Sequence, residues 1–537
     1  MSICEAPSAW ERRLFVGCAL LLLLLQPVPT AAGGVTVITH GFSGNVNGWI
    51  SGMAGAVARS ARFPGTNYTT YTITLTTDGS NYFYQWSRSN SIPSATDSGE
   101  IIVKLDWSQM AGGGGSGSYN LSTYVVANIA STVLLQTNAI SDLGGHALAE
   151  FPLHLIGHSR GGSLVSELSR RLGTNGVWVD HLTTLDPHPV NNDGNSEIFF
   201  PTDASASNTC ATVLFCDDYW QHLGDGLFTP NGESVAGAYV RQMTNLSGGY
   251  SSSHSDAHLW YHGTIDWNTP TSDTEATITN AERQAWWISS EQRGTNTGFL
   301  YSLIGGGDRL SFQQPMGPGT RAIRDGYNQM WDLGAGIANN RAALATNNGT
   351  WPSLIRFNRT DTNQLAYGQA LGVRFYYQWA RPPASNALVS FYLDDDQNPL
   401  NSNSQFIGQL TVPATGTGVN SVTTAFSIYP TNATPGTHTL FALMTAGGRS
   451  RYLYAPELVQ VLPGQQPPTL DITQLSSSQI RIGVHGQVGQ TLVLQAGGDL
   501  VNWQSIATNT LSASAWLLTN SQPSAVPRLF YRVKLQD

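Results

Sequence analysis

A serine with a glycine two residues away on either side stands at the centre of the pentapeptide Gly157-His158-Ser159-Arg160-Gly161. This pattern is typical of a nucleophile elbow, a sharp strand-to-helix turn that lifts a serine hydroxyl out of a sheet to attack an acyl carbon. Glycine is needed at both flanks because the turn is strained and its backbone packs against neighbouring backbone. The alternative is an ordinary loop, because such short matches arise by chance in a chain with 56 glycines.

A serine nucleophile needs a base and an acid, and both residue types follow it in the chain. Asp186 ends an apolar run and precedes a proline. A buried carboxylate there could hold the imidazole of a catalytic histidine in the correct tautomer. His254, His258 and His262 could supply that imidazole, and we expect His254 because it precedes the helical pattern that contains the other two. The alternatives are a turn-capping aspartate and surface histidines.

The same chemistry requires two backbone N–H groups aimed at the oxyanion of the tetrahedral intermediate. Removing one such donor commonly raises the barrier by about 3 kcal/mol. We expect one donor to be the amide of Arg160, directly after the serine. The other is the amide of Phe42, in the small-residue loop that begins at His40. The alternative for residues 40–42 is a simple turn at the end of a strand.

Hydrophobic patterns predict the elements that would position these residues. Short apolar or β-branched runs predict strands at 35–39, 68–75, 101–105, 153–156 and 177–185. Apolar residues at three- and four-residue spacing predict helices between several of these strands, including one directly after the pentapeptide. Alternating strands and helices indicate an α/β domain with a mostly parallel sheet.

Residues 35–265 resemble the pancreatic/lipoprotein lipase family of α/β-hydrolases. Five matching segments follow the family's order: His40-Gly41-Phe42 with Trp49, Leu105-Asp106-Trp107, the stretch from His154 to Ser159, Arg170-Arg171, and Leu185-Asp186-Pro187. In that family the catalytic histidine stands six residues before an aromatic pair, which selects His254 here. The resemblance implies an α/β-hydrolase fold, with ester hydrolysis by Ser159, Asp186 and His254 and an oxyanion hole at Phe42 and Arg160.

The sequence departs from the family in two places. Arg160 replaces the usual leucine after the serine, and we expect it to place a cation beside the oxyanion site. The family's larger disulfide-bounded lid is absent. Both departures concern the choice of lipid, because ester hydrolysis itself needs only the triad and the oxyanion hole.

The N-terminal residues have the pattern of an export signal. Arg12 and Arg13 precede an apolar run at 14–25, and small residues then offer a cleavage site, so we expect a signal peptide at 1–32 and a secreted, extracellular protein. A membrane anchor is the alternative, but the run is shorter than the roughly 20 residues that a spanning helix needs. In an oxidising compartment we expect Cys210 and Cys216 to form a disulfide, the alternative being two buried thiols.

The charge balance limits the partners. Charged residues make up 11% of the chain, the net charge is −9, and there is no basic block, so nucleic acid and anionic membrane surfaces are not expected as partners. We expect no membrane-spanning segment in the mature protein. No organic cofactor and no metal centre are implied. The polar run 191–197 could ligate Ca²⁺ through its oxygens or could be an ordinary polar turn.

Composition shifts divide the chain. We expect a catalytic domain at 33–294, a linker or small subdomain at 295–350, a β-sandwich at 351–462, a linker at 463–468 and a small β domain at 469–537. The last domain resembles modules that end secreted bacterial proteins. Both β domains could therefore attach the enzyme to a surface or a polymer.

The interpretation is a secreted, lipase-type serine hydrolase that cleaves acylglycerol-type carboxylic esters through an acyl-enzyme. A phospholipase A1 or a polyester hydrolase is the alternative within the same chemistry. A binding or adhesion protein with an inert hydrolase domain is the alternative of another class.

Overall fold

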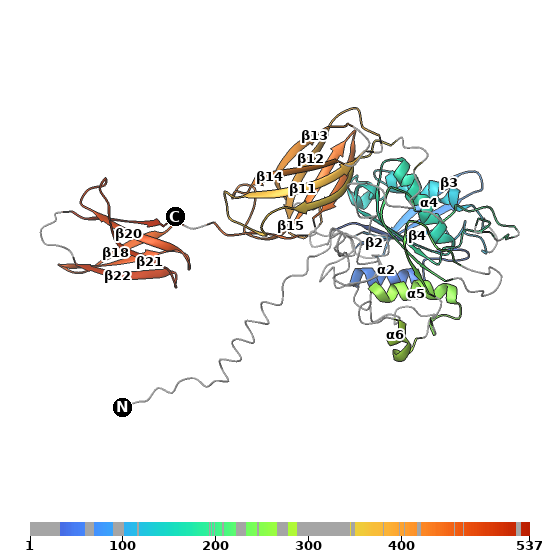
Figure 1. The fold of residues 1–537 in the computed structure, drawn as a ribbon, viewed down its shortest axis with the longest axis horizontal. Helices are drawn as coiled ribbons and strands as arrows, with labels where there is room; N and C mark the ends of the chain where they lie inside the picture. Colours follow the sequence, from blue (N-terminus) through green and yellow to red (C-terminus); the bar gives the residue numbers. More distant parts are fainter. Residues whose placement is uncertain are drawn as a thin grey trace. The chain divides into compact units, whose positions relative to one another are not determined.

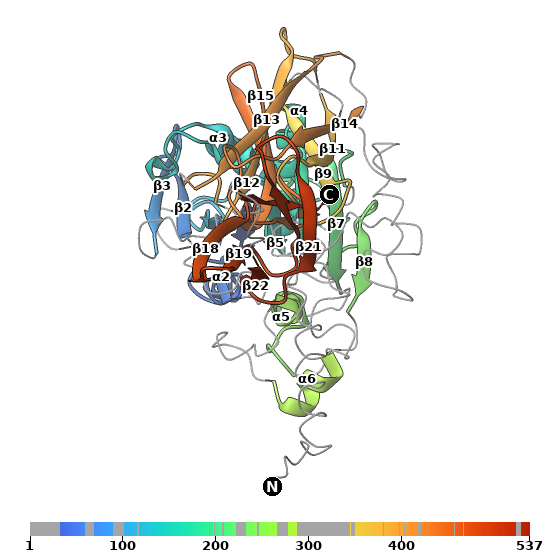
Figure 2. The ribbon, with the colours of Figure 1, turned by 90° about the vertical axis from the view of Figure 1, so that its left-hand side faces the viewer.

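The predicted strands form the centre of an eight-stranded sheet with the order β3-β2-β4-β1-β5-β6-β7-β8 (Figures 1 and 2). All neighbouring strands are parallel except β2 and β3. The prediction of a mostly parallel sheet is therefore confirmed. The strands are β1 Val35–Thr39, β2 Thr69–Thr77, β3 Tyr82–Arg88, β4 Ile101–Asp106, β5 Leu153–His158, β6 Val179–Leu185, β7 Val213–Trp220 and β8 Tyr239–Gln242.

The structure is a computed structural model, and it describes only part of the chain. The described residues are 33–59, 69–89, 101–114, 118–192, 194, 196–197, 199–206, 209–221, 232–243, 246, 248–265, 278–286, 344 and 349–536, the last range without 380, 397, 402, 416–419, 456, 465–466 and 522–527. The expected signal peptide at 1–32 and nearly all of the expected linker at 295–350 lie outside the described residues.

Helices cover both faces of this sheet. They are α2 Trp49–Arg59, α3 Thr123–Leu135, α4 Arg160–Thr174, α5 Ser253–Ile265 and α6 Asn280–Trp286. Because successive side chains of a strand point to opposite faces, Val37 packs with α3 and α4, whereas Ile38 packs with α2 and α5. Figure 1 shows α2 and α5 side by side on one face of the sheet.

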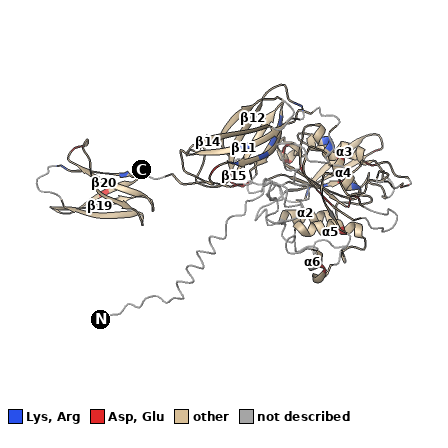
Figure 3. Cartoon of the chain, in the orientation of Figure 1, with Lys and Arg blue, Asp and Glu red and all other residues tan. Residues whose placement is uncertain are grey.

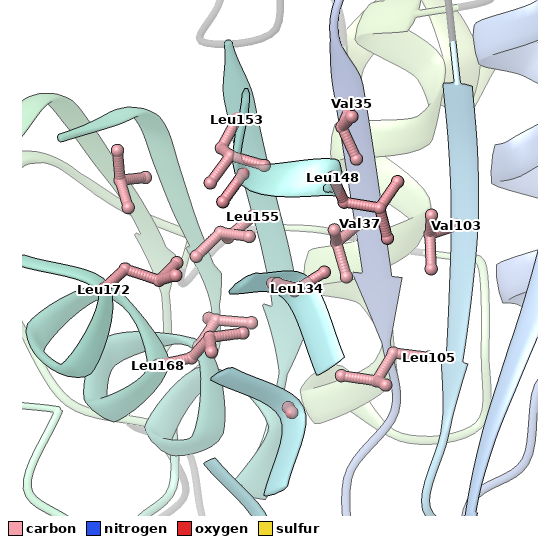
Figure 4. Packing of buried hydrophobic residues seen from close by; sticks show 14 of the residues in the cluster. Val35, Val37, Val103, Leu105, Leu134, Leu148, Leu153, Leu155, Leu168 and Leu172 are labelled. Atoms are coloured by element: carbon pink, nitrogen blue, oxygen red, sulfur yellow. The ribbon is translucent and has the colours of Figure 1, made fainter. Parts of the chain in front are cut away.

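Large aliphatic side chains hold the layer formed by α3 and α4 against the sheet. In Figure 4, Leu168 and Leu172 of α4 and Leu134 of α3 face Leu153 and Leu155 of β5, and all of these side chains are buried. Burying each such side chain stabilises the fold by about 1.5–3 kcal/mol. This packing fixes the start of α4, and with it the turn that carries Ser159.

The strand β7 has no periodic signal in the sequence, although it lies inside the sheet. Seven of its eight residues are buried, including Asp217 and Asp218. Asp217 accepts hydrogen bonds from Thr183 and Tyr219, and Asp218 accepts one from Thr184. Polar partners on adjacent strands therefore make two buried carboxylates compatible with a core strand. Burial also raises the pKa of Asp218 well above its ordinary value.

The expected disulfide is not present: Cys210 and Cys216 are two separate, buried thiols. The amide of Val213 donates to the Cys210 carbonyl oxygen across a turn at 3.1 Å, and β7 begins at Val213. Cys216 therefore lies three residues along an extended strand, about 10 Å beyond the turn. A disulfide requires Cα atoms within roughly 7 Å. Because Cys216 lies in β7 and Cys210 lies before the turn, closeness in sequence does not by itself bring the two thiols within bonding distance.

A β-sandwich follows in the same compact unit, which extends to Val461. Its sheets have the orders β10-β17-β15-β12-β13, with β16 on β15, and β14-β11-β9, and they share one apolar core. The strands are β9 Ser353–Arg359, β10 Gln364–Leu365, β11 Ala370–Gln378, β12 Ala387–Asp394, β13 Gln405–Val412, β14 Asn420–Ser427, β15 Gly436–Ala446, β16 Arg449–Tyr454 and β17 Val459–Val461.

One buried arginine of the sandwich bonds the backbone of the first sheet. Arg451 on β16 donates from Nη1 to the carbonyl oxygens of Ala149 at 2.8 Å and Phe151 at 2.6 Å. Its Nη2 donates to the carbonyl oxygen of Trp178 at 2.9 Å. These carbonyls lie just before β5 and β6, the strands that lead to Ser159 and Asp186.

The second unit, Leu462–Asp537, is built from two three-stranded sheets around a small core. The sheets are β18-β19-β22 and β21-β20-β23, with β18 Thr469–Ser476, β19 Gln479–His485, β20 Thr491–Gly497, β21 Gln504–Thr510, β22 Ala515–Ser521 and β23 Phe530–Leu535. Trp503 is half-buried and lies beneath the Arg532 guanidinium at 4.3 Å.

Charged side chains are sparse along the ribbon, as the composition predicts (Figure 3). Within the described residues, no helix combines the length and the apolar character needed to cross a membrane.

Candidate active site

Ser159 lies at the turn between β5 and α4 with φ 59° and ψ −129°, a backbone conformation that non-glycine residues rarely adopt. Close backbone packing explains the flanking glycines. A Cβ on Gly157 would lie 2.1 Å from the Gly161 carbonyl oxygen, and one on Gly161 would lie 2.5 Å from the His40 carbonyl oxygen. The segment 157–161 therefore forms a strained strand-to-helix turn.

Asp186 lies directly after β6 and is fully buried. Its Oδ1 accepts a hydrogen bond from the Gln221 amide at 2.7 Å, and its Oδ2 accepts one from Gln221 Nε2 at 2.7 Å. The same Oδ2 lies 2.5 Å from His254 Nδ1. A carboxylate can only accept, so Nδ1 of His254 carries the proton and Nε2 keeps its lone pair for use as a base.

Of the three candidate histidines, the structure brings His254 to the acid. It is the second residue of α5, and its side chain is 18% exposed. His258 and His262 are one and two turns further on, and both are buried. His258 stacks on Trp49 with ring centroids 4.3 Å apart. Burial, together with the neighbouring imidazoles of His158, His254 and His262, lowers the pKa of His258 well below its ordinary value.

Ser159 and His254 lie at the same edge of the sheet. The ring of His254 is 4.5 Å, between centroids, from the ring of His158, the residue directly before Ser159. Among the described residues, no hydrogen bond joins the Ser159 hydroxyl to an imidazole. In enzymes without a bound substrate this bond is often long and tightens only when substrate binds.

The loop at 40–42 packs directly against the serine. A Cβ on Gly41 would lie 2.6 Å from the Ser159 Cβ and 2.9 Å from its Oγ. Trp107 holds this loop through two bonds: its amide donates to His40 Nε2 at 3.3 Å, and its Nε1 donates to the His40 carbonyl oxygen at 3.0 Å. His40 Nδ1 in turn donates to the Gly41 carbonyl oxygen at 2.9 Å. The Phe42 amide thus follows a residue that touches the serine side chain.

The amide of Arg160 is the first of α4, at the positive end of that helix, where N–H groups lack partners within the helix. Its side chain differs from our expectation of a cation beside the oxyanion site, because its charge is paired with a carboxylate. The guanidinium is fully buried and donates to Asp203 from Nε at 2.7 Å and from Nη2 at 2.8 Å. Further bonds to Ala111, Asn120 and Leu121 complete its donor set.

Several residues of this site have no signal in the sequence. Asp203 and Gln221 reach their partners across 43 and 35 residues of chain, so neither spacing nor periodicity points to them. Phe200 packs edge-on against Phe42 with centroids 5.1 Å apart. Its neighbour Phe199 is 97% exposed and has φ 73°. An apolar side chain is therefore held in solvent next to a residue that packs on the loop at 40–42.

In the polar run 191–197, which could ligate Ca²⁺, the two end residues hydrogen-bond each other. The Asn191 amide donates to Glu197 Oε2 at 2.7 Å, and the Glu197 amide donates to Asn191 Oδ1 at 2.6 Å. Residues 193 and 195 of this run lie outside the described residues. In the part of the chain that is described, no cluster of three or more His, Cys, Asp or Glu is arranged to hold a metal ion.

Comparisons with known proteins do not assign the chain to a family. No protein-family model matches it, and no curated protein is similar to it. Among solved structures it is similar to a superoxide reductase (neelaredoxin) from Ignicoccus hospitalis, with 13% identity over 21% of this chain and 80% of that chain and a TM-score of 0.14. A CARDB domain from Pyrococcus furiosus matches with 9% identity over 21% of this chain and 96% of that chain, also with a TM-score of 0.14. These scores are too low to inform fold or function.

Proposed function

We propose that this protein is a secreted, lipase-type serine hydrolase of carboxylic esters, with an α/β-hydrolase fold at 33–294. The observation that carries the proposal is the pair His254 Nδ1 and Asp186 Oδ2 at 2.5 Å, set at the sheet edge where Ser159 occupies a strained turn. The chain order of serine, acid and base is that of α/β-hydrolases. The motifs at 40–42, 105–107 and 185–187 support the pancreatic/lipoprotein lipase family.

In the proposed reaction, Ser159 Oγ attacks the ester carbonyl carbon while His254 Nε2 takes the hydroxyl proton. The tetrahedral intermediate collapses, the C–O bond to the alcohol breaks, and His254 returns the proton to the departing alkoxide. Water then attacks the acyl-Ser159 ester with the same proton transfers and releases the carboxylic acid. Asp186 stays ionised and stabilises the imidazolium that forms in each half-reaction.

The oxyanion would lie between the amides of Phe42 and Arg160. The close approach of Gly41 to Ser159 supports this assignment, because the next amide along the loop is then near the reacting carbon. The neutralised Arg160 side chain supports it too, since that residue then contributes only its amide and the positive end of α4. No cofactor is needed for these steps.

The decisive experiment is labelling with a fluorophosphonate, which phosphonylates an activated serine. We expect stoichiometric modification of Ser159 in the intact protein and none in Ser159→Ala. Ser166→Ala is the matched control, because Ser166 lies on the same helix and bonds the Gly162 carbonyl oxygen. A folded protein that resists the probe would favour a binding or adhesion protein with an inert hydrolase domain.

The substrate follows from an ester panel applied to the unmodified protein, with protein fully labelled at Ser159 as the inactive control. We expect acylglycerols to be cleaved. Preferential hydrolysis of the sn-1 ester of phospholipids would instead identify a phospholipase A1, and depolymerisation of a polyester film would identify a polyester hydrolase. Attachment to a surface or a polymer is proposed for the β domains, and the part of the last domain in it is tested by comparing binding of the intact chain with that of residues 33–461.

A further inference from the structure

A second imidazole lies beside the nucleophile, and the proposed reaction has no chemical step for it. His158 is the last residue of β5 and is buried. Its Nε2 is 2.9 Å from the backbone carbonyl oxygen of His254. A carbonyl oxygen can only accept, so His158 Nε2 carries a proton and donates it. This hydrogen bond spans 96 residues of chain.

Aromatic neighbours hold the His158 ring in this orientation. His258 meets it edge-on with centroids 4.8 Å apart, and Trp49 meets it edge-on at 5.8 Å. Trp49 belongs to α2 and His258 to α5, so side chains from two helices of the same layer pack against the His158 ring. Burial lowers the pKa of His158 well below its ordinary value, and a positive charge on His254 lowers it further. His158 is therefore neutral when His254 becomes an imidazolium.

We propose that His158 is a positioning residue, whose Nε2–H bond to the His254 carbonyl oxygen ties the start of α5 to the elbow and sets the reach from His254 Nε2 to Ser159 Oγ. The proposal rests on the proposed function. His158 and Ser159 are adjacent in the chain and are joined by one rigid peptide unit. If His254 moves away from His158, it therefore also moves away from Ser159. Asp186 controls the rotation of the imidazole, and His158 controls the position of its backbone.

The size of the effect follows from the geometry of proton transfer. A base must come within about 2.6–3.2 Å of the atom that it deprotonates. A misplacement of about 1 Å commonly lowers the rate about 100-fold. His254 and Ser159 share no hydrogen bond in the described structure, so the His158 bond is the hydrogen bond that joins the residue before the serine to the backbone of His254 itself. Its loss should reduce kcat and leave substrate binding nearly unchanged.

A matched pair of variants isolates the hydrogen bond. His158→Gln places an amide N–H near the position of Nε2, whereas His158→Met has similar length and no donor. For a water-soluble ester, we expect His158→Met to lose about 100-fold in kcat with KM changed less than about threefold. We expect His158→Gln to retain most of the wild-type kcat. The rate of fluorophosphonate labelling at Ser159 should follow kcat in both variants.

Equal activity in the two variants, or an undiminished kcat in His158→Met, would overturn the positioning role. The proposed function fails separately, if the wild-type protein itself is not labelled. If both variants melt below the assay temperature, the wild-type protein provides the test. In protein with ¹⁵N-labelled histidine, the His158 ring should be neutral with the proton on Nε2 from pH 6 to pH 8. A proton on Nδ1, or titration in this range, would disprove the proposal.

Discussion

Gly41 and Ser159 approach so closely that a methyl group on residue 41 would lie 2.6 Å from the serine Cβ. The backbone carbonyl oxygen of His158 would lie 2.9 Å from the same methyl group. The loop carrying the Phe42 amide therefore has no room to move nearer to the serine, and no side chain fits between them. This contact packs the loop that follows β1 against the turn that carries Ser159.

The first prediction concerns this contact. Gly41→Ala should force the oxyanion loop away from Ser159 and lower kcat about 100-fold or more, since losing one oxyanion donor costs that much. The overpacking should also destabilise the fold by about 1–3 kcal/mol. Gly48→Ala is the control, because a Cβ there meets nothing within 4 Å. Wild-type ester hydrolysis by Gly41→Ala would contradict the assignment of the loop.

The second prediction concerns the buried ion pair of Arg160 and Asp203. Arg160→Leu leaves the Asp203 carboxylate buried with only the amides of Thr123 and Val190 as donors. We expect a loss of about 3–5 kcal/mol in unfolding free energy, as for other broken buried pairs. Asp203→Asn should cost a similar amount, and the double variant should cost less than the sum of the two. Denaturant unfolding of all four proteins measures this coupling, and simple additivity would refute it.

The third prediction concerns the exposed Phe199. We expect its ring to contact the surface of an aggregated, water-insoluble ester substrate. Phe199→Asn removes the ring and also suits the backbone, since asparagine tolerates the positive φ of this position better than phenylalanine does. Hydrolysis of a dispersed long-chain ester should fall about tenfold, or about 1.4 kcal/mol, while hydrolysis of a soluble short-chain ester stays the same. Val501→Asn, at a residue of the second unit that is 81% exposed, should change neither rate.

The fourth prediction concerns pH and the first turn of α5. Burial raises the pKa of Asp256 from 3.8 to about 6. Between these values the folded state keeps a proton that the unfolded state releases, so this group makes the protein less stable as pH rises through that window. Asp256→Asn retains an acceptor for the Tyr250 amide, which donates to Asp256 Oδ1 at 2.8 Å.

After allowance for solvent screening, Asp256→Asn should gain about 1–2 kcal/mol at pH 7 and almost nothing at pH 4. Thermal melts at the two pH values measure the difference. Asp78→Asn gives the opposite trend as a control, because amide donors from Asn81 and Ser80 lower the pKa of the exposed Asp78. A gain at pH 4 as large as at pH 7 would exclude the buried carboxylate as its cause.

The sequence predicted the central strands and the turn at Ser159 because strand periodicity and flanking glycines are local signals. It also led to the neighbouring pair Asp186 and His254, since both follow the element order expected for an α/β-hydrolase. The partners of Asp186 and Arg160 were not predictable, because Gln221 and Asp203 meet them only in the folded chain. Sequence proximity was misleading for Cys210 and Cys216, which form no disulfide.

The hydrogen bonds of Arg451 determine where the chain can be truncated or fused to another protein. Its guanidinium bonds carbonyl oxygens just ahead of the two strands that end at Ser159 and Asp186, and it comes from the sandwich. The sandwich therefore cannot be removed or exchanged without breaking these bonds, and a folded fragment should run from residue 33 to residue 461 as a single piece. New tails or fusion partners should be joined only beyond Val461, where the following unit has its own core.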